Sequence, residues 1–246
     1  MRVGVIFLIL LLAGPARGAD SITVAVASNF VRSAVELAER FEAETGIPVR
    51  LSNGSTGKLY AQIVNGAPFD VFLAADTERP ARLEQSGHAV PESRFTYAKG
   101  ALVLWSRRAG DCRAALSDSN SGRIALANPE TAPYGKAAVE YLSGAGFWGA
   151  VSGRAVYGEN INQALQFVAT GNAVVGIVAK SQLAAPELPA AACTWEVPSA
   201  SYTGLEQQAV LLARAADNAA AKSFYAWLQS DTARKIIGSH GYEVMP

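Results

Sequence analysis

Residues 49–62 (VRLSNGSTGKLYAQ) have the residue types and spacing of an anion-binding corner. A β-branched run is followed by a turn of small polar residues, and apolar residues at helical spacing then begin. The first N–H groups of a helix have no partner inside it and lie at the positive end of the helix dipole, so they attract anions. Ser55 and Thr56 would add hydroxyl donors. The alternative interpretation is that Ser55 or Thr56 only caps the helix.

Three further corners of this kind follow predicted strands elsewhere in the chain. Each places polar residues or a glycine-rich turn where a helical periodicity begins. In one of them Pro133 lacks an N–H group and suits the first position of a helix, so Tyr134 presents the next free N–H. Because the same polar strand-to-helix corner recurs, anion binding is favoured over a set of unrelated helix caps. The residues at these corners are Ser28 and Asn29, Pro133 and Tyr134, and Asn160 and Ile161.

The elements that position these corners alternate as strand, helix and strand, which predicts a parallel α/β sheet with right-handed crossovers. Ligands bind outside the carboxyl ends of the strands in such sheets, and the polar corners fall there. The expected strands are residues 22–27, 49–52, 70–75, 101–106, 122–128, 174–179 and 207–213. The expected helices are residues 30–44, 57–65, 77–85, 136–142, 161–170, 219–228 and 232–238.

Residues 1–18 have the pattern of a secretory signal peptide. Arg2 precedes an apolar stretch that is shorter than the roughly 20 residues needed to span a bilayer. Small residues at positions 16 and 18 predict cleavage after Gly18, and no later segment is apolar enough for a membrane helix. We therefore expect an exported, soluble protein in an oxidising compartment. About 228 residues then remain, enough for one large or two small domains.

The charge balance and the cysteine spacing argue against two further kinds of function, nucleic-acid binding and metal binding by cysteines. The chain has 21 basic and 21 acidic residues without charge runs, so a nucleic-acid partner is not expected. Cys112 and Cys193 fit no metal-ligand spacing. In an oxidising compartment they are expected to form a disulfide, and the alternative is two unpaired cysteines too distant to meet.

An enzyme is the first alternative class. A nucleophile would need a base, and His88 and His240 lie beside glycines with no carboxylate or cysteine at motif spacing. The GSTGK stretch is not a phosphate loop, because Ser52 replaces a required glycine and Leu59 follows Lys58 where Ser or Thr is required. Lys58 is expected on the surface.

Four segments in this order resemble the periplasmic molybdate-binding proteins of ABC importers: ASNF, SNGSTGKLYAQIVNGAPFDVFLAAD, NPETAPYGKAA and VVGIVA. The resemblance covers essentially the whole mature chain. It implies an α/β class II periplasmic-binding-protein fold, with two lobes and a ligand cleft between them. It also implies a periplasmic monomer that binds molybdate or tungstate and delivers it to an ABC transporter permease. No cofactor is implied, and molybdenum or tungsten would be present only as the oxyanion.

The resemblance also implies the lobes and the oxyanion donors. Lobe 1 would comprise residues 19–98 and 205–246, and lobe 2 would comprise residues 99–204. Some family members contact the oxyanion with a tyrosine after the GIV strand, but this chain has Ala179 there and resembles the subgroup that uses the Asn of the ASNF turn. The implied donors are Ser28, Asn29, Thr56 with Ser55 adjacent, and the backbone N–H groups of Tyr134 and Ile161.

A binding protein for sulfate or phosphate is the second alternative. A phosphate site would favour a carboxylate that accepts the proton of the ligand, and Asp76 is the nearby candidate. A carboxylate repels a bare dianion, so Asp76 is expected instead to cap the helix at residues 77–85.

Overall fold

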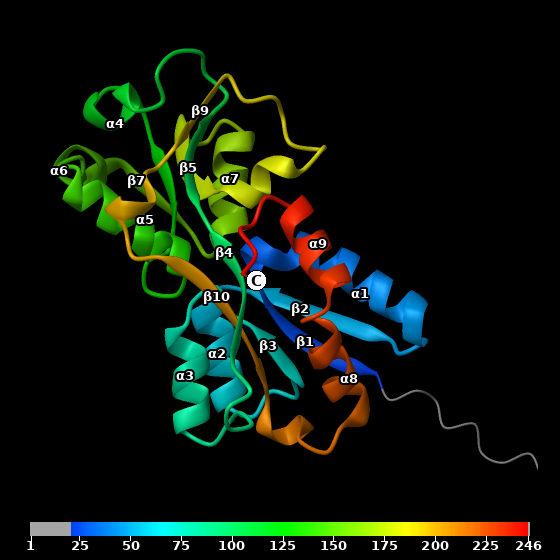
Figure 1. Ribbon diagram of the computed structural model, residues 1–246. Helices are drawn as coiled ribbons and strands as arrows, with labels where there is room; N and C mark the ends of the chain where they lie inside the picture. The colour runs from blue at the N-terminus through cyan, green and yellow to red at the C-terminus, as the bar shows by residue number, and fades with distance from the viewer. Residues whose placement is uncertain (1–20, 246) are drawn as a thin grey trace, which may run out of the picture.

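The computed structural model describes residues 21–245. The expected signal peptide, residues 1–18, lies outside the described residues. The chain folds into two α/β lobes, each built around a five-stranded sheet with helices packed on it (Figure 1). No helix among the described residues is long and apolar enough to cross a membrane.

Lobe 1 contains a mixed sheet with the strand order β2-β1-β3-β10-β4. β1 pairs in parallel with β2 and β3, as the alternation of strands and helices predicts. β10 runs antiparallel to β3 and β4, because the chain returns to this sheet from the other lobe. The strands are β1 (Ile22–Ala27), β2 (Val49–Gly54), β3 (Val71–Leu73), β4 (Phe95–Gly100) and β10 (Leu205–Leu211).

Helices cover the sheet of lobe 1 because each presents one apolar face to it. In α1, Leu37 and Phe41 are buried, and Phe41 packs edge-on against Phe224 of α8 with ring centroids 5.1 Å apart. Gly46 ends α1 with a φ of 71°, which glycine adopts without strain. The helices of lobe 1 are α1 (Val31–Thr45), α2 (Thr56–Val64), α3 (Glu78–Gln85), α8 (Ala219–Trp227) and α9 (Asp231–Ser239), with 3₁₀ turns at Ser28–Phe30 and Ala213–Ala215.

Lobe 2 repeats the arrangement with the strand order β7-β6-β8-β5-β9. β6 is parallel to β7 and β8, and β5 is antiparallel to β8 and β9. The strands are β5 (Leu102–Ser106), β6 (Ile124–Ala127), β7 (Ala155–Gly158), β8 (Val175–Ala179) and β9 (Cys193–Glu196). The helices are α4 (Ala114–Ser117), α5 (Pro133–Gly144), α6 (Trp148–Val151) and α7 (Ile161–Ala169), with 3₁₀ turns at Ser152–Arg154, Lys180–Ala184 and Ser199–Ser201.

The expected strand ranges leave out three edge strands, β4, β7 and β9. Each pairs with a single neighbour and is partly solvated, and in β4 and β9 polar residues hide the apolar alternation. The helix predicted from residue 136 begins earlier, because the missing N–H of Pro133 is harmless at the first position. The strands predicted at residues 122–128 and 207–213 are Ile124–Ala127 and Leu205–Leu211.

The chain crosses between the lobes at the carboxyl end of β4. Gly100 is the last residue of β4 and Leu102 the first of β5, so Ala101 alone separates the two strands. The chain returns to lobe 1 through residues 197–204 and enters β10. The boundary expected between residues 98 and 99 lies two residues before the end of β4.

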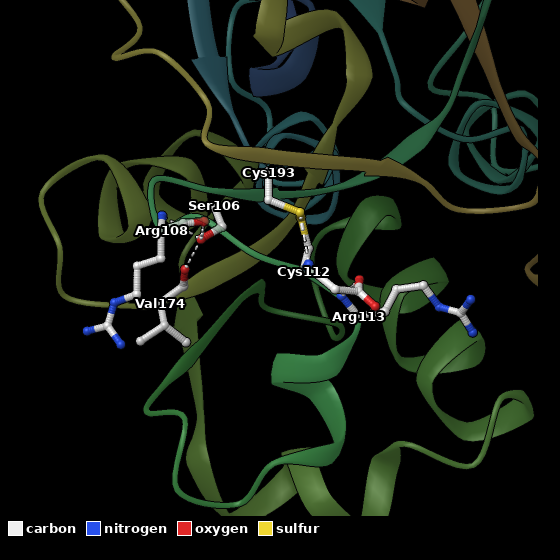
Figure 2. Close-up of a disulfide and its surroundings, with 7 residues drawn as sticks. Ser106, Arg108, Cys112, Arg113, Val174 and Cys193 are labelled. Carbon is white, nitrogen blue, oxygen red and sulfur yellow. Dashed lines mark hydrogen bonds between the residues drawn. A yellow bond between two sulfur atoms is a disulfide. The ribbon is translucent and has the colours of Figure 1, made fainter.

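A disulfide joins Cys112, in the loop before α4, to Cys193 at the start of β9 (Figure 2). The two Cα atoms are 5.8 Å apart. Beside the disulfide, the hydroxyl of Ser106 donates to the carbonyl oxygen of Val174 over 2.7 Å (Figure 2). The disulfide and this hydrogen bond both lie within lobe 2, so they constrain that lobe and leave the relation between the lobes free.

Candidate functional site

The carboxyl ends of β1 and β2 place two polar corners side by side. Ala27 and Gly54 are paired in the sheet, so Ser28 and Ser55, which follow them, leave it at neighbouring positions. These serines are only 4% and 2% exposed. Hydroxyl groups buried this deeply require hydrogen-bond partners.

Ser55 occupies the N-cap position of α2, yet its hydroxyl makes no capping hydrogen bond. Its Oγ atom is buried and has no partner among the described residues. The neighbouring Thr56 is also buried, and its Oγ1 accepts a hydrogen bond from the N–H of Ala75 at 3.3 Å. The interpretation that Ser55 only caps the helix is therefore wrong, and its hydroxyl can donate to a ligand oxygen.

Asn29 lies in the same corner, but its side-chain amide is engaged within the protein. The Nδ2 atom donates to Gln207 Oε1 at 2.8 Å and to the hydroxyl of Tyr242 at 3.0 Å. These two acceptors use both amide hydrogens. The expectation that Asn29 contacts an oxyanion stays a prediction, and its Nδ2 can do so only by exchanging one of these partners.

In lobe 2, the paired ends of β6 and β7, at Ala127 and Gly158, place the other two corners. Tyr134 is the second residue of α5 and is buried. Its N–H donates to no acceptor among the described residues. Gly135 brings this turn close to the sheet, because a Cβ atom there would lie 2.3 Å from the carbonyl oxygen of Ala127.

The second corner of lobe 2 is capped in a way that leaves one N–H free. The Oδ1 of Asn160 accepts hydrogen bonds from the N–H groups of Asn162 and Gln163, at 3.0 and 3.1 Å. Ile161, the first residue of α7, is buried, and its N–H donates to no acceptor in the described part of the chain. The free N–H group at this corner is therefore that of Ile161, and its expected contact with an oxyanion stays a prediction.

The corners of the two lobes face each other. The N–H of Gly57 in α2 donates to the carbonyl oxygen of Thr131 at 2.8 Å. The Nδ2 of Asn162 in α7 donates to the carbonyl oxygen of Ser28 at 3.0 Å. These bonds bring the N-termini of α2 and α7 together with the loop before α5, so the structure has its two lobes in contact at the predicted site.

Buried apolar side chains of both lobes pack together at the meeting point. Ala27 and Ala75, at the strand ends of lobe 1, belong to the same buried cluster as Ala127, Tyr134 and Ile161 of lobe 2. In such low-dielectric surroundings a hydrogen bond to an anion is stronger than in water. The site thus combines neutral polar groups with buried apolar neighbours.

Charged side chains near the site pair with each other. Lys58 is half exposed, as expected, and forms an ion pair with Glu159 of the opposite lobe. The Oδ1 of Asp76 accepts from the N–H of Arg79 at 3.0 Å, which confirms the predicted cap of α3, and the carboxylate also pairs with the Arg79 guanidinium. Burial raises the pKa of Asp76, and the nearby Arg79 charge opposes this rise.

Tyrosines supply the buried hydroxyl groups behind the site. Burial raises the pKa of Tyr97 and Tyr134 well above the ordinary value, and it also raises the pKa of Tyr242. All three therefore stay neutral at physiological pH. Among residues 21–245, no cluster of three His, Cys, Asp or Glu side chains is placed to hold a metal ion.

Sequence reasoning missed three polar residues beside the site. Gln207 is fully buried in β10, and only its position in an apolar strand could have singled it out. Tyr242 reaches the first corner from the other end of the chain, without a sequence signal. The Oγ1 of Thr131 is buried and has no partner among the described residues.

Two α/β lobes that each contribute helix N-termini to one buried polar site define a two-lobed solute-binding protein. The chain belongs to the family of bacterial extracellular solute-binding proteins, whose family model matches residues 22–243.

Individual relatives are similar over almost their whole length. The molybdate-binding protein ModA of Azotobacter vinelandii is 45% identical over 235 residues, which cover 94% of this chain and 93% of the relative. ModA of Rhodobacter capsulatus is 42% identical, with 96% and 92% covered. The solved structure of the Azotobacter vinelandii periplasmic molybdate-binding protein matches with a TM-score of 0.85 and 37% identity, over 92% of this chain and 100% of that one. The sulfate-binding protein SubI of Mycobacterium tuberculosis matches at a TM-score of 0.72 and 15% identity, over 92% of this chain and 87% of that one, which shows the shared fold alone.

Proposed function

We propose that this protein binds the tetrahedral oxyanion molybdate, or tungstate, in the periplasm and delivers it to the membrane permease of an ABC transporter. The names of its ModA relatives, at 45% and 42% identity, support the ligand class. The observation that carries the proposal within the site is the buried hydroxyl of Ser55, which neither caps α2 nor bonds to another described residue.

The proposed donors are neutral. They are the hydroxyl groups of Ser28, Ser55 and Thr56, the corner residue Asn29, and the backbone N–H groups of Tyr134 and Ile161. Hydrogen bonds to a charged acceptor contribute roughly 1.5 to 3 kcal/mol each and replace the water shell of the dianion. About five to seven such bonds are compatible with micromolar or tighter affinity after association costs.

Phosphate is disfavoured by the pairing of Asp76. A protonated phosphate needs an acceptor for its hydrogen, and the carboxylate of Asp76 is held by its own helix and by Arg79. Sulfate does not need such an acceptor, so the site has to distinguish sulfate from molybdate by size. Calorimetric competition among molybdate, tungstate, sulfate and phosphate tests the assignment. Tighter binding of sulfate or phosphate would overturn the ligand while leaving the fold in place.

We further propose that the lobes close on the ligand by a hinge near residues 97–100 and 201–205. Neither lobe alone holds the full donor set, so the ligand binds the closed form more tightly than the open one. Small-angle scattering should give a smaller radius of gyration when molybdate saturates the protein. An unchanged radius, at ligand concentrations that calorimetry shows to be saturating, would refute closure.

A further inference from the structure

Gln207 lies at the centre of a buried hydrogen-bond network between the lobes. Its side chain in β10 is 0% exposed. The Oε1 atom accepts from Asn29 Nδ2 at 2.8 Å and from the hydroxyl of Tyr97 at 3.1 Å, and the Nε2 atom donates to the hydroxyl of Tyr134 at 3.1 Å. The amide therefore bonds to one proposed donor residue of each lobe.

The other side of Asn29 is held by Tyr242. The hydroxyl of Tyr242 donates to the backbone oxygen of Asn29 at 2.8 Å and accepts from Asn29 Nδ2 at 3.0 Å and from the hydroxyl of Ser181 at 2.9 Å. The single hydrogen of the Tyr242 hydroxyl is used on the carbonyl, so the Asn29 amide must turn its nitrogen toward Tyr242. This arrangement leaves the second amide hydrogen of Asn29 for Gln207.

The close approach of Tyr134 to Gln207 depends on a glycine at the lobe crossing. A Cβ atom on Gly100 would lie 1.9 Å from the Tyr134 hydroxyl and 2.9 Å from Gln207 Nε2. Only a residue without a side chain leaves this space for the phenol. The network is thus built into the point at which the chain passes from one lobe to the other.

We propose that Gln207 is a positioning residue of the oxyanion site, which holds Asn29 of lobe 1 and Tyr134 of lobe 2 in one common frame. The proposal rests on the proposed function of the site. Gln207 does not contact the oxyanion. It acts by keeping one amide hydrogen of Asn29 bonded while the other is exchanged from Tyr242 to the oxyanion, and by anchoring the first turn of α5 through the Tyr134 side chain. Donors from both lobes then converge when the lobes meet.

Calorimetric titration of sodium molybdate into a set of variants tests this role. Gln207→Met keeps the length of the side chain and removes its hydrogen bonds, and affinity should fall by about 10- to 100-fold. Gln208→Met is the matched control, because the neighbouring side chain bonds to Thr96 and Arg94 near the surface. The control should bind within about twofold of the wild type.

A double-variant cycle separates positioning from a general loss of stability. If Gln207 acts through Asn29 and Tyr134, then Gln207→Met should cost only the loss expected from the Tyr134 arm, about 3- to 10-fold, when Asn29→Ala is already present. Losses that multiply in the double variant, or wild-type affinity in Gln207→Met, would overturn the proposal. If Gln207→Met does not fold, Tyr134→Phe removes only the lobe 2 arm of the network and should weaken binding by about 3- to 10-fold. Unchanged affinity for molybdate in Tyr134→Phe would then overturn the proposal.

The wild-type titration distinguishes this proposal from the proposed function. A wild type that does not bind molybdate refutes the function, and titration of the same variants with sulfate then tests Gln207. A wild type that binds molybdate, with Gln207→Met binding equally well, refutes the positioning role alone.

Discussion

The N–H of Gly57 in lobe 1 donates to the carbonyl oxygen of Thr131 in lobe 2, with the two atoms 2.8 Å apart. A Cβ atom on Gly57 would lie 3.0 Å from both the Cα and the carbonyl oxygen of Thr131. A side chain at this position would press on the backbone of Thr131, and the contact links the N-terminus of α2 directly to the loop before α5.

Gly57→Ala should have opposite effects on folding and on binding. Alanine favours helix over glycine by up to about 1 kcal/mol, so the ligand-free protein should be as stable as the wild type or more stable. The added methyl group presses on Thr131 and separates the lobes, so molybdate affinity should fall by about 3- to 30-fold. Gly144→Ala, at the end of α5, is the control, since a Cβ atom on Gly144 would have no neighbouring atom within 4 Å. Wild-type affinity in Gly57→Ala would contradict the requirement for close contact.

Ser55→Ala should reduce binding without reducing stability. The Ser55 hydroxyl has no partner among the described residues, so its removal takes no hydrogen bond from the ligand-free fold. Molybdate affinity should fall by about 10- to 100-fold if the hydroxyl donates to the oxyanion. The reciprocal control is Ser230→Ala, because Ser230 caps α9 by accepting from the N–H of Ala233 at 3.2 Å. That control should lose about 1 kcal/mol of unfolding free energy and keep its affinity.

Thr56→Val should lower both the unfolding free energy and the affinity for molybdate. The hydroxyl of Thr56 accepts from the buried N–H of Ala75, so valine leaves that N–H unpaired and costs about 1 to 2 kcal/mol of unfolding free energy. Affinity for molybdate should also fall by about 10- to 100-fold. Thr56→Ser retains the hydroxyl and should bind within about threefold of the wild type. Urea unfolding and calorimetry measure the two effects, and a Thr56→Val protein with full affinity would show a structural role only.

Stability should fall in alkaline solution. Tyr97, Tyr134 and Tyr242 have pKa values raised by burial, so the native state holds their protons above pH 10.0 while the unfolded chain releases them. The unfolded state then binds fewer protons, and the unfolding free energy decreases by about 1.4 kcal/mol per pH unit for each such tyrosine. Below pH 10 this contribution is fully present. Urea unfolding at a series of pH values checks the slope, and a stability that stays constant to pH 11 would be inconsistent with buried neutral tyrosines.

Replacement of both cysteines by serine should destabilise lobe 2 and spare the site. The loop between Cys112 and Cys193 spans 81 residues, and loss of such a crosslink costs about 2 to 4 kcal/mol. Molybdate affinity should stay within about twofold, because β8 and β5 lie between the disulfide-bearing strand β9 and the site strand β6. Loss of binding at a temperature where the variant is folded would show that the disulfide positions the site.

The sequence alone predicts the local features of this protein. Helix N-termini with polar corners at Ser28, Ser55, Tyr134 and Ile161 could be recognised because strand, turn and helix signals are read over a few neighbouring residues. The parallel arrangement of β1, β2 and β3 follows from the alternation of elements. The resemblance to a known family also predicts the two-lobed fold and the ligand class, because each of its motifs is a contiguous stretch of the sequence.

Only the tertiary structure decided how distant residues complete the site. Asn29 bonds to Gln207, 178 positions away, and to Tyr242, 213 positions away, and no local pattern encodes such pairs. The same holds for the contact between Gly57 and Thr131, which depends on how two separately folded lobes meet. Hydrophobic periodicity determines which face of an element is buried, but the partner that a buried polar side chain finds there is determined by packing across the whole chain.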